Sequence, residues 1–260
     1  MLNIAVIGCG WLGLPLAVSL VKNNHTVFGT TTSINKIPYL KELGISSFIL
    51  DLSKPIQINQ VEFLNKIDLV IINIPPSKLK GDKSYSDSLL ELVKLTQTST
   101  KIILISTTGV YPDEVQLADE SYKFKSEDLE KETVQAEVKL IDYLTNRLTI
   151  IRLAGLIGED RHPVKFLAGR KDIPNGNAPI NLIHQNDAIG IINKVIDENY
   201  WGEIINGCYP SHPVKSQYYT DKAILLDLEP PLFLNQGEEC KKVSEIKSIK
   251  ELKYSYSSPI

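Results

Sequence analysis

The chain has 260 residues, of which 43% are hydrophobic and 23% charged, and its net charge at pH 7 is −3. This composition is typical of a water-soluble globular protein, and a slight negative charge without a basic cluster argues against nucleic acid as a partner. No apolar run reaches the ~18 residues of a membrane span, so we expect no membrane partner. Residues 1–20 predict a strand and a loop rather than a signal peptide.

The three cysteines, Cys9, Cys208 and Cys240, lie far apart in the chain and show no CxxC spacing. An odd number of distant cysteines predicts neither a disulfide framework nor a metal site, and it is typical of a reducing compartment. We therefore expect a cytoplasmic protein without bound metal, either a monomer or a homodimer.

A β-branched run at residues 3–7 leads into a G-x-G-x-x-G pattern that opens an apolar helix at 12–23. In such a turn Gly8 permits the tight bend, Gly10 lets a pyrophosphate approach the backbone, and Gly13 lets the helix pack closely on the strand. The helix N-terminus offers N–H groups and a partial positive charge to phosphates. The residues predicted to surround the phosphates are Gly8, Gly10, Trp11, Leu12 and Gly13.

A second strand, at 26–30, ends without the Asp or Glu that NAD enzymes place about 20 residues past the glycines to bind the ribose 2′-OH. Hydroxyl groups and Lys36 stand there instead, and these suit a 2′-phosphate. We predict NADP as the cofactor, with NAD as the alternative. Ser33 also fits the N-cap of a helix over 33–43, with Gly44 as its C′ residue. The residues predicted around this ribose are Thr30, Thr31, Thr32, Ser33 and Lys36.

Apolar runs and helical patterns alternate from there to residue 155. The runs are rich in Ile, Val and Leu without polar alternation, which is typical of strands buried on both faces of a parallel sheet. We predict further strands at 46–50, 68–74, 101–106 and 148–153, and helices at 84–98 and 127–145. The fold class is therefore α/β, a Rossmann-type doubly wound parallel sheet.

After Gly155 the pattern changes to shorter pieces punctuated by Pro and Gly, with helices predicted at 187–198 and 214–228. We interpret residues 1–155 as a dinucleotide-binding Rossmann core. Residues 156–260 are then a small C-terminal α+β lobe on the substrate side, packed on the core as one structural unit.

Three segments carry a family resemblance: STTGVY at 106–111, RLAGLIG at 152–158 and NLIHQNDA at 181–188. They are similar to the S-S/T-x-x-V-Y, R-x-x-x-(I/V)-(Y/I)-G and N-x-I-H-V-x-D-(L/V)-A motifs of the extended short-chain dehydrogenase/reductases. That family contains the NAD-dependent epimerases and dehydratases. Over nearly its whole length the chain resembles the atypical YeeZ-type branch most closely, and this branch shares the GxGxxG form.

The resemblance implies roles for several residues. Asp51 and Leu52 resemble the pair whose backbone brackets the adenine ring, and Ile74 and Pro75 are expected beside a cofactor ribose. Ser106 completes the expected cofactor residues. Thr107 stands at the Ser/Thr position that orients a substrate carbonyl, although a polar end to a buried strand explains it equally. Tyr111 is the nearest phenol and the second candidate for catalysis.

The proton relay of the family is missing. Active members carry Y-x-x-x-K on the next helix, where the i, i+4 spacing places a phenol and the lysine that lowers its pKa on one face. Residues 126–139 contain no Tyr. Aligning Ala136-Glu137 with the family's A-E pair places Leu129 at the Tyr position and Thr133 at the Lys position.

On the substrate side, Arg161 and His162 follow Gly158 in a loop where relatives carry G-x-x-R-x-P. The Arg161 cation suits a phosphate or carboxylate of a substrate, and it suits the nearby Glu159 carboxylate equally. His184 belongs to the N-x-I-H segment and is expected to act through structural hydrogen bonds.

The sequence thus predicts an NAD(P)-binding oxidoreductase or epimerase for a small polar or nucleotide-linked substrate, with an atypical active site. The alternative is a non-catalytic NADP-binding sensor or scaffold. A β-hydroxyacid dehydrogenase, which shares the glycine pattern, needs a long all-helical C-terminal half that the Pro/Gly-punctuated tail does not offer.

Overall fold

A computed structural model describes residues 1–79, 83–237 and 239–260. The chain forms two compact units that are not contiguous in sequence. Unit 1 comprises Met1–Ser106, Phe124–Arg152 and Ile192–Ile205, and unit 2 comprises Thr107–Lys123, Leu153–Ile191 and Asn206–Ile260. These bounds differ from the expected parts 1–155 and 156–260. Residues 107–123 and 153–155 lie in unit 2, and residues 192–205 lie in unit 1.

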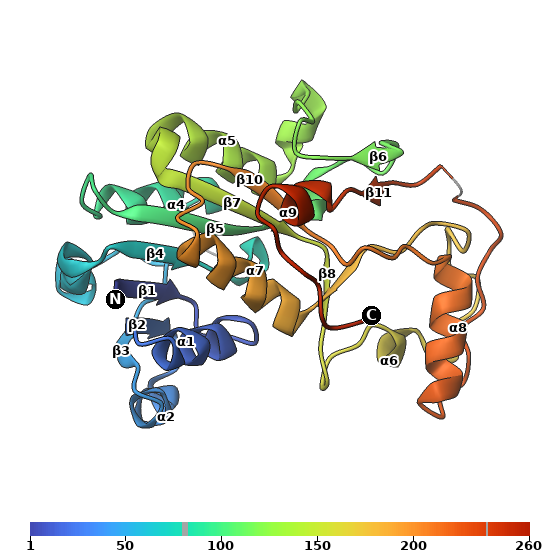
Figure 1. The fold of residues 1–260 in the computed structure, drawn as a ribbon, viewed down its shortest axis with the longest axis horizontal. Helices are drawn as coiled ribbons and strands as arrows, with labels where there is room; N and C mark the ends of the chain where they lie inside the picture. The colour runs from blue at the N-terminus through green and yellow to red at the C-terminus, as the bar shows by residue number, and fades with distance from the viewer. Residues whose placement is uncertain (80–82, 238) are drawn as a thin grey trace. The chain divides into compact units, whose positions relative to one another are not determined.

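A seven-stranded sheet has the order β10-β7-β5-β4-β1-β2-β3 (Figure 1). The pairs β1–β2, β2–β3, β1–β4 and β4–β5 are parallel. All six predicted strands are present in this sheet. Of its described strands the sequence missed one, the short edge strand β10, which has two apolar residues in its four. The strands are β1 Asn3–Ile7, β2 Thr26–Thr31, β3 Ser46–Ile49, β4 Leu69–Ile72, β5 Lys101–Thr107, β7 Leu148–Leu153 and β10 Ile204–Gly207.

The order of the strands reverses between β1 and β4. From β1 the chain continues outward to β2 and β3, and it then returns to add β4, β5 and β7 on the other side. In open α/β sheets, ligands bind in the crevice outside the carboxyl ends of the strands at such a switch point. The predicted α/β doubly wound fold is confirmed.

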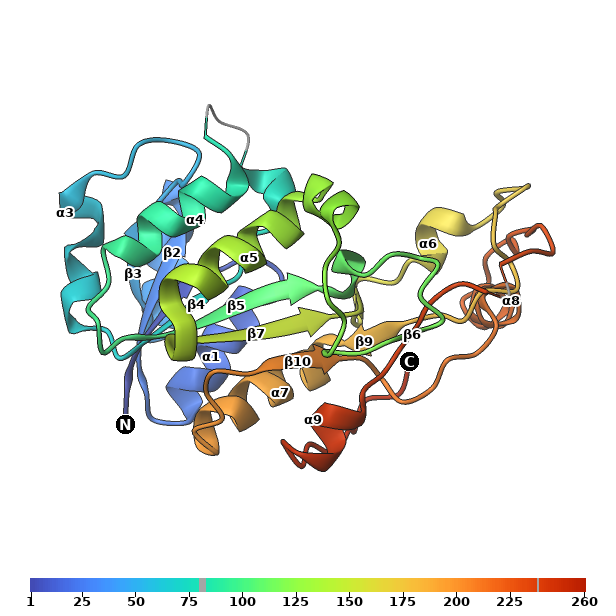
Figure 2. The ribbon, with the colours of Figure 1, turned by 90° about the horizontal axis from the view of Figure 1, so that it is seen from above.

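Helices cover both faces of this sheet, with α4 and α5 on one face and α1 on the other (Figure 2). The helices of this part of the chain are α1 Gly13–Lys22, α2 Ile37–Glu42, α3 Ile58–Val61, α4 Tyr85–Lys94, α5 Glu132–Leu144 and α7 Gln185–Asp197. Between the sheet and the α4–α5 layer lies a fully buried apolar core that includes Ala5, Ile72, Leu89, Leu104 and Leu140. On the other face, the Asn193 amide of α7 donates to the Ser19 hydroxyl of α1 at 2.9 Å.

Two of the predicted helices are each divided into a 3-10 segment and a shorter α-helix. The helix expected over 33–43 is a 3-10 turn at Ile34–Lys36 followed by α2, and Gly44 follows it with φ +78° as its predicted C′ residue. The helix expected over 127–145 is a 3-10 segment at Ser126–Glu130 followed by α5. Lys131 has extended backbone angles between the two pieces, so the chain turns there instead of continuing the helix.

Unit 2 contains two small two-stranded sheets, β6–β11 and β8–β9, and short helices. A buried carboxylate fixes its C-terminal segment: Asp187 accepts hydrogen bonds from the Tyr254 hydroxyl at 2.8 Å and from the backbone N–H groups of Ser257 and Ser258, both at 3.0 Å. Its elements are β6 Leu117–Ala118, β8 Gly155–Ile157, α6 Val164–Leu167, β9 Leu182–His184, α8 Lys215–Leu225, β11 Lys242–Val243 and α9 Ile246–Lys250. None of the described helices is long and apolar enough to cross a membrane.

Candidate functional site

The glycine turn joins β1 to α1 in the geometry that the motif predicts. Gly8 has φ +102°, and a Cβ there would lie 2.8 Å from the Asn73 carbonyl oxygen. A Cβ on Gly13 would lie 2.1 Å from the Gly8 carbonyl oxygen, so only glycine lets α1 approach β1 this closely. A Cβ on Gly10 would meet no described atom within 4 Å. The turn therefore has open space where the motif predicts a pyrophosphate.

Side chains from both neighbouring strands hold this turn. The Thr30 hydroxyl of β2 accepts the Gly8 N–H at 3.0 Å, and the Asn73 amide, just after β4, donates to the Gly8 carbonyl oxygen at 3.3 Å. Trp11 and Leu12 follow the turn, and Leu12 is buried while Trp11 is half-buried. Thr30 is itself buried, so its hydroxyl group shapes the loop rather than facing a ligand.

Polar side chains follow Thr31, the last residue of β2. The Thr31 hydroxyl accepts the Ser33 N–H at 3.1 Å and so closes the turn after the strand. The Ser33 side chain makes no capping hydrogen bond to the described helix that follows it, so the capping role weighed for it is not seen. Thr32 and Lys36 are exposed and Ser33 is half-buried, which leaves these three side chains at the surface beside the glycine turn.

The ends of β3 and β4 contain the other residues expected to line a dinucleotide. The Asp51 carboxylate accepts hydrogen bonds from the hydroxyl and the N–H of Ser53. The hydrogen bond from the Ser53 hydroxyl is the main cause that lowers the pKa of Asp51. Leu52 is buried beside it. After β4, Ile74 is half-buried and Pro75 exposed.

Tyr85 braces the same edge from the first turn of α4. Its hydroxyl donates to the Ile74 carbonyl oxygen at 2.8 Å, and burial raises the pKa of Tyr85 well above its usual range. Tyr85 therefore acts as a neutral donor that fixes the chain after β4.

A buried ion pair at the end of β5 was not predicted from the sequence. The Glu137 carboxylate of α5 and the Arg152 guanidinium of β7 are 0% and 1% exposed, and their closest N–O distance is 2.6 Å. Arg152 Nε lies 3.2 and 3.1 Å from the two carboxylate oxygens, and the guanidinium carbon is 5.1 Å from the centroid of the Phe124 ring. The Ser106 hydroxyl donates to Glu137 Oε1 at 2.6 Å. The only hint in the sequence was the A-E pair at Ala136-Glu137.

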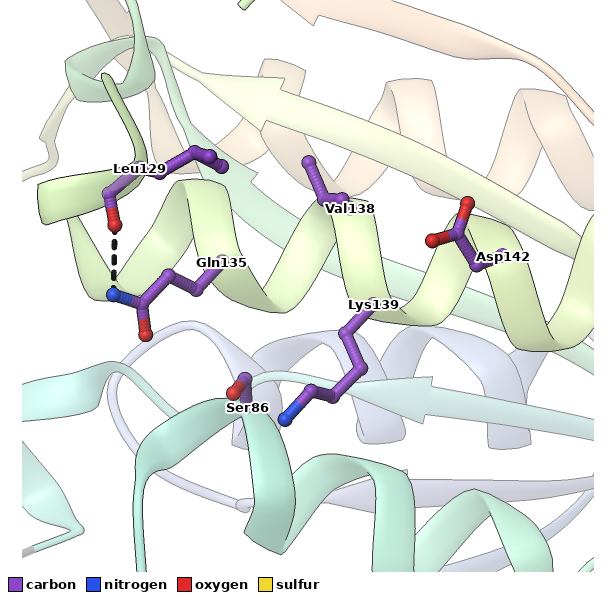
Figure 3. Close-up of a pocket in the computed structure, with 6 residues that line it drawn as sticks. All are labelled: Ser86, Leu129, Gln135, Val138, Lys139 and Asp142. Carbon is purple, nitrogen blue, oxygen red and sulfur yellow. Dashed lines mark hydrogen bonds between the residues drawn. The ribbon is translucent and has the colours of Figure 1, made fainter. Parts of the chain in front are cut away.

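Leu129 and Thr133 are the residues that the sequence comparison is expected to place at the Tyr and Lys positions of the extended short-chain dehydrogenase/reductases. Leu129 lies in the 3-10 segment before α5 and is 42% exposed, and Thr133 lies in the first turn of α5. The Gln135 amide donates to the Leu129 carbonyl oxygen at 2.7 Å. A surface hollow of about 410 Å³ is lined by Ser86 of α4 and by Leu129, Gln135, Val138, Lys139 and Asp142. Figure 3 shows these six side chains.

The two candidate catalytic residues, both in unit 2, differ in exposure. The Thr107 hydroxyl accepts the Gly109 N–H at 3.1 Å and is exposed, so it keeps its own proton for a ligand oxygen. Tyr111 is 0% exposed, and its hydroxyl donates to Asn206 Oδ1 at 2.9 Å. The Asn206 amide in turn donates to the Ser244 carbonyl oxygen, so Tyr111 is part of a buried hydrogen-bonded chain. Tyr111 could donate a proton to a substrate only if its hydrogen bond to Asn206 were broken.

The predicted substrate-side residues are part of hydrogen-bonded turns. Gly158 and Arg161 exchange backbone hydrogen bonds at 2.8 and 3.2 Å, and the Arg161 side chain is exposed. His162 Nδ1 accepts the Val164 N–H, and Nε2 lies 3.0 Å from the Tyr218 hydroxyl. Burial is the main cause that lowers the pKa of His162, so the ring is neutral at pH 7.

His184 accepts the Asn186 N–H through Nδ1 at 3.2 Å, a local contact at the start of α7. The structural residue in this motif is instead Asp187, whose buried carboxylate fixes the C-terminal segment. Within residues 1–79, 83–237 and 239–260, no group of three or more His, Cys, Asp or Glu residues is placed to hold a metal ion.

Comparison with known proteins gives the family. No family model matches the chain. Protein YeeZ of Escherichia coli strain K12 is 33% identical over 270 residues, and the match covers 100% of this chain and 97% of YeeZ. The chain belongs to the YeeZ family. This confirms the resemblance to that branch, over the full length of the chain.

Solved structures with this fold include members of the epimerase group. A conserved protein of unknown function from Silicibacter pomeroyi has a TM-score of 0.75 at 18% identity, covering 100% of this chain and 95% of its own. UDP-glucuronic acid 4-epimerase from Bacillus cereus, solved in complex with NAD, also has a TM-score of 0.75 at 18% identity, covering 99% and 94%. This YeeZ family chain therefore shares the Rossmann-like fold of the NAD-dependent epimerases and dehydratases.

The buried ion pair allows a test of stability. We expect Arg152→Ala to lower the free energy of unfolding by about 3–5 kcal/mol, because it leaves the Glu137 carboxylate buried without its counter-ion. Urea unfolding at pH 7 measures the loss. Lys139→Ala is the matched control, since Lys139 contacts Asp87 at 2.6 Å with both side chains substantially exposed. A pair of that kind contributes about 0–1 kcal/mol, and equal losses in the two variants would contradict this account.

Proposed function

We propose that this chain binds a nicotinamide dinucleotide at the carboxyl edge of the unit 1 sheet. The observation that carries the proposal is the glycine turn, where Gly13 brings the N-terminus of α1 against β1 and Gly10 leaves open space. Backbone N–H groups and the helix dipole at such a terminus favour a pyrophosphate. The B. cereus epimerase of the same fold was solved with NAD, which supports the choice of ligand class.

The polar end of β2 favours NADP over NAD. An NAD site of this fold places a carboxylate there, which would repel a 2′-phosphate. Here the exposed side chains of Thr32 and Lys36 and the half-buried Ser33 can donate to phosphate oxygens instead. Asp51 and Leu52 then stand on the adenine side, while Ile74, Pro75 and Ser106 stand on the nicotinamide side.

As an enzyme, the protein would be an oxidoreductase or epimerase acting on a small polar or nucleotide-linked substrate. A bound nicotinamide supplies hydride transfer, and this chain's residues must then orient the substrate and move its proton. The Thr107 hydroxyl has a proton to donate to a substrate oxygen. The exposed Arg161 can meet a substrate phosphate or carboxylate. The proposed setting is the cytoplasm, which suits three free cysteines.

A second candidate function follows from Leu129 and Thr133. Neither side chain can ionise near neutral pH, so the pair that normally moves the proton in this family has no counterpart at these positions. A protein that keeps the dinucleotide turn without this relay is suited to act as a non-catalytic sensor or scaffold. Turnover in the presence of candidate substrates distinguishes the two functions.

The binding site is tested at Gly10. We expect Gly10→Val to abolish binding of NADPH and NADH while the protein stays folded, because the new side chain enters the space proposed for the pyrophosphate and its Cβ would meet no described atom within 4 Å. Isothermal titration calorimetry measures affinity, and circular dichroism with thermal unfolding checks the fold. Gly10→Ala should give a smaller loss. Unchanged affinity in Gly10→Val would refute the assignment.

Cofactor choice is tested at Lys36. A charge-assisted hydrogen bond contributes about 1.5–3 kcal/mol, so NADPH should bind roughly tenfold or more tightly than NADH. Lys36→Ala should narrow this ratio by weakening NADPH binding alone. Lys41→Ala, an exposed lysine further along α2, is the matched control and should leave the ratio unchanged. Equal affinities in the wild type, or a preference for NADH, would contradict the NADP assignment.

The missing relay has a kinetic consequence. General acid–base catalysis contributes typically ~10²–10⁴ in rate, so simple ketones should cause little or no NADPH oxidation, as followed at the absorbance band of the reduced nicotinamide. Thr107→Ala should leave cofactor affinity nearly intact and remove any residual turnover. Rapid reduction of a simple ketone that survives Thr107→Ala would show that the proton donor lies elsewhere, with Arg161, His162 and His184 the next residues to test.

A further inference from the structure

At the carboxyl end of β5, the Ser106 hydroxyl has a fixed hydrogen-bonding direction. Its proton points to Glu137 Oε1 at 2.6 Å, and Glu137 is a fully buried carboxylate on α5. A carboxylate accepts hydrogen bonds and donates none, so Ser106 must be the donor in this contact. The hydroxyl has only one proton, and therefore any further partner of Ser106 must donate to its oxygen.

Arg152 holds the Glu137 carboxylate in place. The guanidinium is always charged, and it donates through both Nε and Nη2 to the carboxylate. Phe124 covers the guanidinium at 5.1 Å from the ring centroid. With the ion pair buried on every side, the Glu137 carboxylate cannot turn to solvent, and the direction of the Ser106 hydrogen bond is built into the core of unit 1.

Ser106 stands where a dinucleotide would pass. Ile7 of β1 pairs with Ile72 of β4, and Ile72 pairs with Leu104 of β5, so Ser106 lies two residues beyond the last paired position of this row. The glycine turn begins directly after Ile7. Strands are about 4.8 Å apart, so β5 lies about 10 Å from β1 along the edge. This is the side of the switch point away from β2, where the nicotinamide half of the ligand would lie.

We propose that Ser106 recognises a hydroxyl group of the nicotinamide ribose by accepting its hydrogen bond, with Glu137 as the positioning residue that sets this polarity. This inference rests on the proposed dinucleotide binding. It assigns Ser106 and Thr107, adjacent in the chain, opposite roles: Ser106 accepts from a ligand hydroxyl, and Thr107 donates to a ligand oxygen. A ligand carbonyl oxygen placed at Ser106 would face the lone pairs of the Ser106 oxygen, because the Ser106 proton is donated to Glu137.

The test compares ligands that differ at one ribose hydroxyl. NADPH is titrated alongside analogues whose nicotinamide ribose carries hydrogen or fluorine in place of the 2′- or 3′-hydroxyl. Fluorine is close to a hydroxyl in size but has no proton to donate. For the hydroxyl that meets Ser106, we expect both replacements to weaken binding to the wild type by about three- to tenfold, the range of one neutral hydrogen bond.

Ser106→Ala should bind NADPH about three- to tenfold more weakly and should lose the discrimination, so that hydroxyl and deoxy ligands bind alike. Thr96→Ala is the matched control, since Thr96 donates to the Val93 carbonyl oxygen at 2.7 Å just after α4 and away from the carboxyl edge. It should keep the full discrimination. Equal discrimination in Ser106→Ala and the wild type overturns the proposal, and so does a fluoro analogue that binds the wild type as tightly as NADPH.

Glu137→Gln separates positioning from mere structural support. Arg152 can only donate, so it selects the carbonyl oxygen of the new amide and leaves the NH₂ group facing Ser106. Ser106 then accepts a hydrogen bond from the Gln side chain and donates its own proton to the ligand. The loss of affinity caused by replacing the ribose hydroxyl with fluorine should therefore be smaller than in the wild type. A structural role alone would weaken all ligands equally. If this variant fails to fold, the Ser106→Ala comparison still decides the proposal.

Failure of the underlying function looks different from failure of this inference. A wild-type protein that binds neither NADPH nor NADH refutes the dinucleotide site as a whole. A wild type that binds NADPH but treats all ribose analogues alike keeps the site and refutes the role of Ser106.

Discussion

The close contact between α1 and β1 is the constraint on which the rest of the site depends. A Cβ at Gly13 would lie 2.1 Å from the Gly8 carbonyl oxygen, so any other residue would push the helix away from the strand. With glycine, the N-terminus of α1 lies at the edge of the sheet where the strand order reverses. Thr30 and Asn73 then hold the turn from the two neighbouring strands. Because the turn is held on both sides, the N-terminus of α1 keeps a fixed position before any ligand arrives.

Each of the two units contains a buried carboxylate that fixes the position of the groups around it. Glu137 in unit 1 and Asp187 in unit 2 are both fully buried, and each is surrounded by donors. A buried charge is expensive unless it is paired, so such a group tolerates few alternative arrangements of its partners. Glu137 thereby fixes the Ser106 hydroxyl, and Asp187 fixes the C-terminal segment.

Local sequence patterns predicted most strands of the large sheet and several helices. Runs of Ile, Val and Leu identified six of the seven described strands of the large sheet, because strands buried on both faces need apolar side chains throughout. Gly44 was recognised as a helix end from its residue type alone. The helix over 127–145 began too early, because its apolar spacing does not reveal the extended Lys131 that separates the 3-10 turn from α5. The strand β10 was missed, since its few apolar residues gain a partner only when the chain returns to the sheet.

By itself the sequence determined the α/β class, the glycine turn, the absence of an acid after β2 and the absence of Tyr from residues 126–139. Each of these depends on residue types within a short stretch of chain. Only the tertiary structure decided which polar side chains form hydrogen bonds or ion pairs with one another. Glu137 and Arg152 are 15 residues apart, and Tyr111 and Asn206 are 95 residues apart. Whether a hydroxyl faces a ligand or a buried partner depends on contacts between distant elements, and no local pattern records these.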